Sequence, residues 1–134
     1  MSRTAVVVVS HSRQLAEGVR ELALQMARGS NSVWAVGGTD DGGIGTSAPA
    51  IFGALVEALG HCEEAVVLMD LGSAHLNTEI AIEMLDDALQ QRVSMADAPL
   101  VEGAILAVVS AAGDAGSAEV RERAEEARRM NKIM

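Results

Sequence analysis

Aromatic side chains are almost absent from this sequence, which has one tryptophan, one phenylalanine and no tyrosine. Proteins that bind single-stranded nucleic acid stack the bases on aromatic rings. The near absence of such rings excludes a stacking platform of that kind. It also means that Val, Leu, Ile, Ala and Met must form the core.

Basic residues are scarce as well, with 10 Lys and Arg against 19 Asp and Glu and a formal net charge of −9. Nucleic acids and anionic membrane surfaces both attract basic proteins. We therefore expect neither nucleic acid nor a membrane as a partner. The acidic charge suits a basic protein partner, although simple solubility explains it equally well.

The chain has a single cysteine, Cys62, so no disulfide can form within it. It has no signal-peptide pattern and no apolar run long enough to span a membrane, which makes a cytoplasmic location the default expectation. Its length of 134 residues, 49% of them hydrophobic, fits a single domain, 1–134, with one core.

Apolar, β-branched segments alternate with segments of helical periodicity. Strands are expected at 5–10, 33–36 and 65–69, and residues 92–95 suit a short edge strand. The expected helices are marked by apolar residues three or four positions apart, namely Leu15, Val19, Leu22 and Met26; Ile51, Leu55 and Leu59; Leu76, Ile80 and Met84; and Ile105, Val108, Val109 and Ala112. A highly charged helix is expected over about 117–134. This alternation predicts an α/β fold with an open, mostly parallel central sheet and helices on both faces.

Polar residues follow each of the first three expected strands. The first strand ends in Ser10-His11-Ser12, a glycine-rich segment over 37–45 follows the second, and Asp70-Leu71-Gly72-Ser73 follows the third. Functional groups of parallel α/β sheets gather at the carboxyl ends of the strands. If the first and third strands are neighbours, His11 and Asp70 face each other at this edge.

A histidine and a carboxylate in this arrangement have a definite chemical use. A carboxylate that accepts the Nδ1 proton fixes the imidazole tautomer and leaves Nε2 as a free nucleophile. Backbone N–H groups of the glycine-rich loop can hold phosphoryl oxygens. The residues thus indicate a receptacle for phosphohistidine. A plainer interpretation, in which His11 lies in an ordinary turn and the loop is only a connection, is also compatible with them.

Other kinds of site find little support. The sequence lacks both G-x-x-x-x-G-K-[ST] and a G-x-G-x-x-G after a strand, which disfavours a directly bound nucleotide. No metal site is expected, because His61 and Cys62 have no further ligand at a suitable spacing. We interpret both as surface residues. His75 is interpreted as an exposed residue that is able to touch a phosphoryl group or a partner.

Four motifs in this order resemble one family. They are SHS at 10–12, GGTDDGGIGTS at 37–47, MDLGSA at 69–74 and ADAPLVEGA at 96–104. Together they resemble the histidine phosphocarrier subunit of the phosphoenolpyruvate-dependent dihydroxyacetone kinase, whose domain is related to mannose-type enzyme IIA of the sugar phosphotransferase system. The resemblance extends from the first strand to about Ala112.

The resemblance implies a role for each matching residue. His11 matches the phosphorylated histidine and Asp70 the carboxylate that orients it, while Gly38, Thr39 and Ser73 match positions around the phosphoryl pocket. It also implies an antiparallel edge strand and a homodimer. No cofactor would be bound directly, because the family passes its phosphoryl group to ADP held on a partner subunit.

The resemblance also implies partners. The phosphoryl donor would be the carrier HPr, and the acceptor would be ADP on the nucleotide-binding kinase subunit, with a further subunit binding dihydroxyacetone. Some members continue into HPr-like and enzyme I-like domains, but no such domain appears up to Met134, so separate carriers are expected.

Two alternative functions stay open. One is a mannose-type transporter enzyme IIA, which typically has D-x-x-G-G-S-P where this chain has DLGSA. The other is a non-catalytic module that binds an anion or a regulatory partner.

Overall fold

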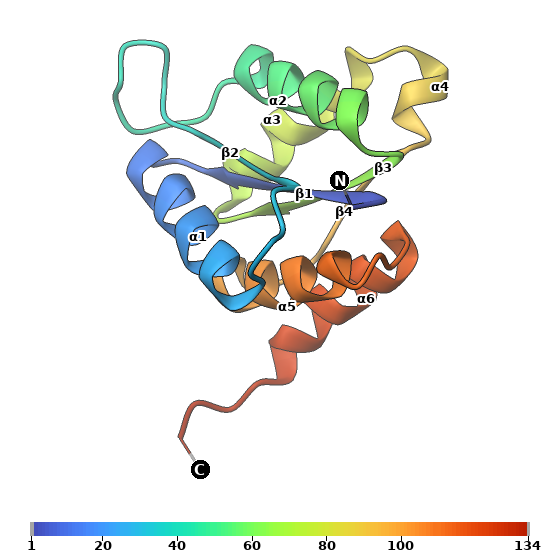
Figure 1. Ribbon diagram of the computed structural model, residues 1–134. Helices are drawn as coiled ribbons and strands as arrows, with labels where there is room; N and C mark the ends of the chain where they lie inside the picture. The colour runs from blue at the N-terminus through green and yellow to red at the C-terminus, as the bar shows by residue number, and fades with distance from the viewer. Residues whose placement is uncertain (1, 134) are drawn as a thin grey trace.

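A computed structural model describes residues 2–133 of the protein. Strands and helices alternate along the chain, and the helices form a layer on each side of a central sheet (Figure 1). The elements are β1 (Thr4–Ser10), α1 (Arg13–Met26), β2 (Val33–Gly37), α2 (Ala48–His61), β3 (Glu64–Met69), α3 (Gly72–Glu83), α4 (Asp87–Gln90), β4 (Val93–Met95), α5 (Leu100–Ala112), α6 (Ser117–Glu126) and the 3₁₀ turn η1 (Ala127–Arg129).

The sheet has the order β2-β1-β3-β4, and all three pairings are parallel. This confirms the predicted α/β fold with a mostly parallel sheet. The expected antiparallel edge strand is absent from residues 2–133. After β3, helices α3 and α4 return the chain to the end at which β3 began, so the edge strand β4 runs parallel to β3. The segment after α5 then forms α6 instead of a further strand.

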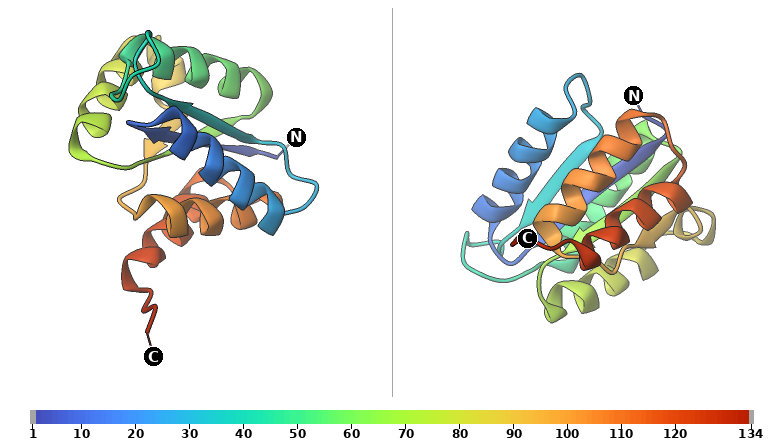
Figure 2. Two further views of the ribbon diagram at one scale, coloured as in Figure 1. Left: turned by 90° about the vertical axis from the view of Figure 1, so that its left-hand side faces the viewer. Right: turned by 90° about the horizontal axis from the view of Figure 1, so that it is seen from below.

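Strand β1 lies at the centre of the core, and all of its residues are buried. Its side chains alternate between the two faces of the sheet. Val6 and Val8 pack in the layer of α1, α5 and α6, whereas Val7 and Val9 pack in the layer of α2. The views in Figure 2 show the same sandwich from the side and from below.

Two helices turn an unexpected face to the core. α1 buries Ala16, Val19 and Ala23, and α3 buries Ala74, Thr78 and Ala81. The larger side chains of the predicted apolar stripes are exposed instead, namely Leu15, Leu22 and Met26 on α1, Leu76 and Ile80 on α3, and Met84 directly after α3. The periodicity located both helices correctly, but only Val19 of the two predicted stripes is buried. Small residues form the rest of each buried face, because they let a helix approach its neighbours closely. None of the helices within residues 2–133 has the length and apolar character that a membrane crossing requires.

The charged C-terminal helix is shorter than predicted. α6 ends at Glu126, η1 follows, and residues 130–133 are not helical, while Met134 lies outside the described residues. Its apolar face nevertheless packs well, because Val120, Ala124 and Ala127 are all buried.

Glu64 at the start of β3 fixes the beginning of α6. Its carboxylate accepts hydrogen bonds from the backbone N–H of Ser117 at 3.1 Å and from the Ser117 hydroxyl at 2.8 Å. These bonds, with a smaller contribution from Arg3, hold the pKa of Glu64 below its ordinary value of 4.5 despite partial burial. A carboxyl group with a lowered pKa stabilises the fold above its unfolded pKa and loses that contribution as the pH falls through the folded value.

We therefore expect Glu64→Gln to lower the free energy of unfolding by about 1–2 kcal/mol at pH 7. The difference from wild type should shrink as the pH falls below 4.5, because Glu64 then takes up a proton in the unfolded chain before it does so in the native protein. Urea unfolding at several pH values measures this. Glu63→Gln is the matched control, because the Glu63 side chain is 77% exposed and lies 3.7 Å from its partner Arg3. Equal losses in the two variants, or a loss that persists at low pH, would contradict the role of Glu64.

Candidate active site

The candidate site lies where β1 and β3 end side by side. The parallel register pairs Val9 with Met69, so the residues that follow each strand emerge next to each other. Ser12 then caps α1 by accepting the backbone N–H of Leu15 at 3.2 Å, which makes the connection from β1 to α1 very short. His11 is thereby fixed in a tight turn beside Asp70.

The Asp70 carboxylate has a donor at each of its acceptor positions. Oδ1 lies 2.9 Å from Nδ1 of His11 and accepts the Leu71 N–H at 2.7 Å. Oδ2 accepts the Ser10 hydroxyl at 2.8 Å and the backbone N–H of His11 at 2.9 Å. Full use of these positions offsets the cost of removing a carboxylate from water.

These hydrogen bonds also determine the charge of Asp70. Burial raises the pKa of this carboxyl group, since the side chain is only 14% exposed. The bonds from His11, Ser10 and Leu71 together outweigh burial, and the pKa lies below its ordinary value of 3.8. Asp70 is therefore an anion throughout the physiological pH range.

The anionic carboxylate determines the tautomer of His11. A carboxylate only accepts hydrogen bonds, so Nδ1 must carry the proton that lies between them. In the neutral ring, Nε2 then has a free lone pair, and the Ser73 hydroxyl is its hydrogen-bond partner. Ser73 is in the first turn of α3, which begins at Gly72 without a side-chain cap. Backbone N–H groups at such a helix start are suited to binding an anion.

The glycine-rich loop between β2 and α2 supports His11 from another side. The Gly45 N–H donates to the backbone oxygen of His11 at 2.8 Å. Gly38 has a φ of +80°, and a Cβ there would lie 3.6 Å from Cβ of Arg13 at the start of α1. The Thr39 hydroxyl donates instead to Asp41 within the loop, and this bond is the main reason why the pKa of Asp41 is lowered. The structure thus places Gly38 beside the turn of His11 but gives the Thr39 hydroxyl a partner in its own loop.

A hollow of about 540 Å³ adjoins Asp70, between the ends of β3 and β4. Its lining is mainly apolar and includes Met69, Leu71, Met95 and Ala98, together with His75 and Asp97. His75 is exposed and pairs with Glu79 at 3.0 Å, one turn further along α3. The surface around His11 therefore offers room and apolar contacts to an approaching molecule.

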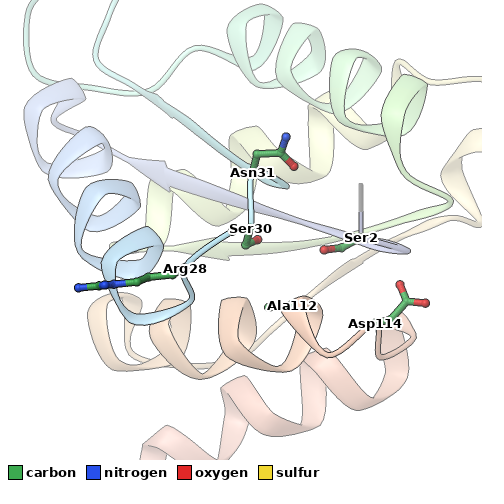
Figure 3. Close-up of a pocket in the computed structure, with 7 residues that line it drawn as sticks. Ser2, Arg28, Ser30, Asn31, Ala112 and Asp114 are labelled. Carbon is green, nitrogen blue, oxygen red and sulfur yellow. The ribbon is translucent and has the colours of Figure 1, made fainter.

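A second pocket lies at the opposite end of the sheet, where the strands begin. It has a volume of about 430 Å³ and is lined by polar side chains that include Arg28, Asn31 and Asp114 (Figure 3). None of its lining residues belongs to the candidate site.

The remaining histidine and the cysteine take no part in the site. His61 is exposed and stacks on Trp34, with ring centroids 6.0 Å apart. Cys62 is buried in the core, so its interpretation as a surface residue was wrong: it directly follows α2, and its side chain packs in the core cluster that also contains Ala58 and Ala65. Within residues 2–133, no three His, Cys, Asp or Glu side chains are grouped in a way that would hold a metal ion.

Two residues that build the site were not predicted from the sequence. The sequence places Ser10 at the end of an apolar strand and gives it no role, whereas in the structure its hydroxyl donates to Asp70. The sequence places Gly37 in a glycine-rich loop. In the structure a Cβ at this position would lie 2.7 Å from the backbone oxygen of Ser10 and 2.9 Å from that of Ser12, so there is no room for a side chain. No pattern in the sequence reveals the Ser10 contact, because its partner lies 60 positions away.

Gly37→Ala should therefore distort the turn that carries His11. The new methyl group meets backbone atoms that cannot move independently, so we expect a loss of about 1–3 kcal/mol of stability and a weakened contact between His11 and Asp70. Chemical denaturation and the NMR signals of the His11 ring measure the two effects. Gly53→Ala in α2 is the control, since a Cβ added there would meet nothing within 4 Å and alanine favours a helix. Gly37→Ala with unchanged stability and His11 signals would contradict this role of Gly37.

Comparison with known proteins places the chain in a family. The family model described as "PTS system fructose IIA component" matches residues 5–121. A relative from Providencia stuartii, "PEP-dependent dihydroxyacetone kinase, phosphoryl donor subunit DhaM", is 39% identical over 91% of this chain, and the chain spans 26% of the length of that relative. A shorter relative from Listeria innocua, "PEP-dependent dihydroxyacetone kinase 2, phosphoryl donor subunit DhaM", is 38% identical over 78% of this chain and 83% of its own length.

A solved structure resembles this chain over nearly its whole length. The crystal structure of the "unknown function protein EF1359" superimposes with a TM-score of 0.86 at 32% identity, covering 98% of each chain. The family model covers most of this chain, and the Listeria relative matches it over most of both lengths. The chain therefore belongs to the mannose-type enzyme IIA family and, within it, to the DhaM subunits of phosphoenolpyruvate-dependent dihydroxyacetone kinases.

Proposed function

We propose that this chain is a histidine phosphocarrier whose His11 accepts a phosphoryl group on Nε2 and passes it to ADP on a dihydroxyacetone kinase. The observation that carries the proposal is the contact of 2.9 Å between Nδ1 of His11 and Oδ1 of Asp70, which keeps the proton away from Nε2. Membership in the DhaM group supports the kinase as the recipient in preference to a sugar transporter. The donor would be HPr, and the transfer would take place in the cytoplasm.

Each transfer replaces one bond to phosphorus by another. In the first, the Nε2 lone pair of His11 forms a bond to the phosphorus, and the bond between that phosphorus and the nitrogen of HPr breaks. In the second, a β-phosphate oxygen of ADP forms a bond to the phosphorus, and the bond to Nε2 breaks. ATP then forms on the nucleotide-binding subunit and phosphorylates dihydroxyacetone on the substrate-binding subunit. The chain itself needs no bound cofactor for either step.

Asp70 acts on the ring throughout this cycle. A ring that is bonded to phosphorus at Nε2 and protonated at Nδ1 carries positive charge, and an anion beside Nδ1 stabilises it. The lowered pKa of Asp70 ensures that this anion is present at neutral pH. The backbone bond from His11 to Oδ2 keeps the carboxylate facing the ring.

Phosphoryl oxygens would be held by groups that are already close to Nε2. The Ser73 hydroxyl is in contact with Nε2 and must turn aside to admit a phosphoryl group, after which it can donate to an oxygen of that group. No side chain caps the start of α3, and backbone N–H groups at a helix start are suited to holding further phosphoryl oxygens. Gly38 lies beside the turn and lets the loop approach without side-chain obstruction. Thr39 would act by shaping this loop, because its hydroxyl and the Gly43 N–H, 3.0 Å apart, are hydrogen-bonded.

The partners would dock on the apolar surface around His11. Exposed apolar residues lie on the segments next to the site, namely Leu15 on α1, Ile44 in the glycine-rich loop, and Leu71 and Leu76 at α3. The hollow beside Asp70 extends this surface. An apolar docking surface excludes water from the reacting atoms, and the net charge of −9 favours partners with a basic contact surface.

Incubation with phosphoenolpyruvate, enzyme I and HPr tests the proposal. The chain should gain the mass of one phosphoryl group, and mass spectrometry should locate it on His11. His11→Asn should accept none, whereas Asp70→Ala should fold and accept it more slowly, on the order of a hundredfold, because the ring loses its orientation and its tautomer. Addition of ADP-loaded kinase subunits and dihydroxyacetone should remove the phosphoryl group from wild type.

Matched controls exclude the other histidines. His61→Ala and His75→Ala should accept the phosphoryl group as wild type does. An acid-labile phosphate on either of them, with His11 unmodified, would refute the assignment. A protein that gains no mass but retains a small anion would instead favour the non-catalytic binding module, and wild-type rates in Asp70→Ala would remove its orienting role.

We also propose that the chain forms a homodimer through the outer face of α5. Apart from Glu102 and Ser110, this helix consists of apolar residues and glycine, a composition that is typical of a buried helix, yet Val101 and Val109 are exposed in the single chain. Its one acidic residue on this side, Glu102, pairs with Lys132. A second copy that packs against this face would bury it.

Analytical ultracentrifugation at micromolar concentration should find a dimer of wild type and a monomer of Val109→Lys. Ile80→Lys on α3 is the matched control, because Ile80 is 48% exposed and Val109 is 47% exposed. It should remain dimeric. A monomeric wild type would refute the dimer, and a dimeric Val109→Lys would refute the interface.

A further inference from the structure

Ser10 is fully buried at the end of β1, directly before His11. Its hydroxyl oxygen lies 2.8 Å from Oδ2 of Asp70 and 3.0 Å from the backbone nitrogen of Ser12. Burial and position alone would explain a small residue here. Alanine is also small and has no hydroxyl group, so size does not explain the two polar contacts that the Ser10 hydroxyl makes.

The direction of the Ser10 proton follows from its two neighbours. The Ser12 N–H can only donate, so it donates to the Ser10 oxygen. The ionised Asp70 carboxylate can only accept, so the single hydroxyl proton of Ser10 must point at Oδ2. Ser10 therefore accepts a hydrogen bond from the Ser12 N–H and donates one to the Asp70 carboxylate, and the two roles cannot be exchanged.

This bond restricts the rotation of the carboxylate. Oδ2 is held by Ser10 and by the His11 N–H, both of which belong to the strand end that carries the ring. With Oδ2 fixed in this way, Oδ1 faces Nδ1 of His11. Without Ser10, the carboxylate keeps the His11 N–H at Oδ2 and its two partners at Oδ1. Its terminal torsion, which has a broad energy minimum, is then held by three bonds in place of four and is less restricted.

We propose that Ser10 is a positioning residue for phosphoryl transfer, which holds the Asp70 carboxylate so that His11 keeps its proton on Nδ1 and its lone pair on Nε2. Ser10 acts through Asp70 and touches neither the ring nitrogens nor a phosphoryl group. The role rests on the function proposed above for His11. The Ser10 bond is also one of those that keep the pKa of Asp70 low against the effect of burial, which keeps the carboxylate charged.

The test combines a spectroscopic readout with a kinetic one. In the unphosphorylated protein, ¹⁵N NMR of the His11 ring should find a single tautomer with the proton on Nδ1 in wild type and a mixture of tautomers in Ser10→Ala. The single-turnover rate of phosphoryl uptake from phosphorylated HPr should fall on the order of tenfold in Ser10→Ala, less than the hundredfold that a misplaced attacking atom can cost. The apparent affinity for HPr should be unchanged, because Ser10 is not on the surface.

Thr4→Ala is the matched control. Thr4 is the first residue of the same strand, is equally buried, and donates its hydroxyl to the Ala115 oxygen at 2.8 Å at the opposite end of the sheet. It should lose stability without a change in tautomer or rate. Ser10→Thr keeps the hydroxyl group and should transfer near the wild-type rate. If Ser10→Ala does not fold, Ser10→Cys, with a similar volume and a weaker donor, should fall between alanine and wild type.

A single tautomer and a wild-type rate in Ser10→Ala would overturn the role of Ser10. So would a Thr4→Ala variant that slows transfer equally, or a Ser10→Thr variant that behaves like alanine, because either result would assign the effect to packing. The NMR experiment needs no phosphoryl donor. Failure of wild type to accept a phosphoryl group would therefore refute the proposed function, while the tautomer measurements would still decide the role of Ser10.

Discussion

The carboxylate of Asp70 is the interaction on which the geometry of the site depends. It accepts hydrogen bonds from the end of β1 and from the start of the α3 segment, and so ties together two parts of the chain about 60 positions apart. A buried carboxylate with an acceptor position left empty would be costly. The bonds that remove this cost are also the bonds that orient His11, so local stability and ring orientation have the same physical cause.

The parallel pairing of β1 with β3 makes this arrangement possible. Adjacent parallel strands end at the same edge, and the register of Val9 with Met69 brings the following residues into contact. Strand β1 is buried on both faces and bonded on both sides, which restricts the motion of the turn that carries His11. The backbone at the start of the glycine-rich segment lies against the turn that carries His11. Gly37 and Gly38 allow this close approach because they have no side chain.

The packing of α1 and α3 through small residues has a consequence for the surface. Ala16 and Ala23 on α1, and Ala74 and Ala81 on α3, face the core and leave larger apolar side chains outside. Such residues on the outside are typical of surfaces that contact other proteins. Leu15 and Leu76 lie on the helices that begin at the candidate site, so the packing of the core and the character of the surface near His11 are linked.

The sequence by itself determined the alternation of strands and helices, the parallel sheet and the loops that share its carboxyl edge, because these follow from local periodicity and from the rules of chain connection. It also indicated His11 and Asp70 as a pair. Only the tertiary structure decided which face of α1 and α3 is buried, since a helix with apolar residues on two faces has no unique orientation in its own sequence. It also decided that Ser10 binds Asp70, that Cys62 is buried and that the Thr39 hydroxyl turns into its loop. These outcomes depend on groups that meet in space, and no local pattern encodes the partner.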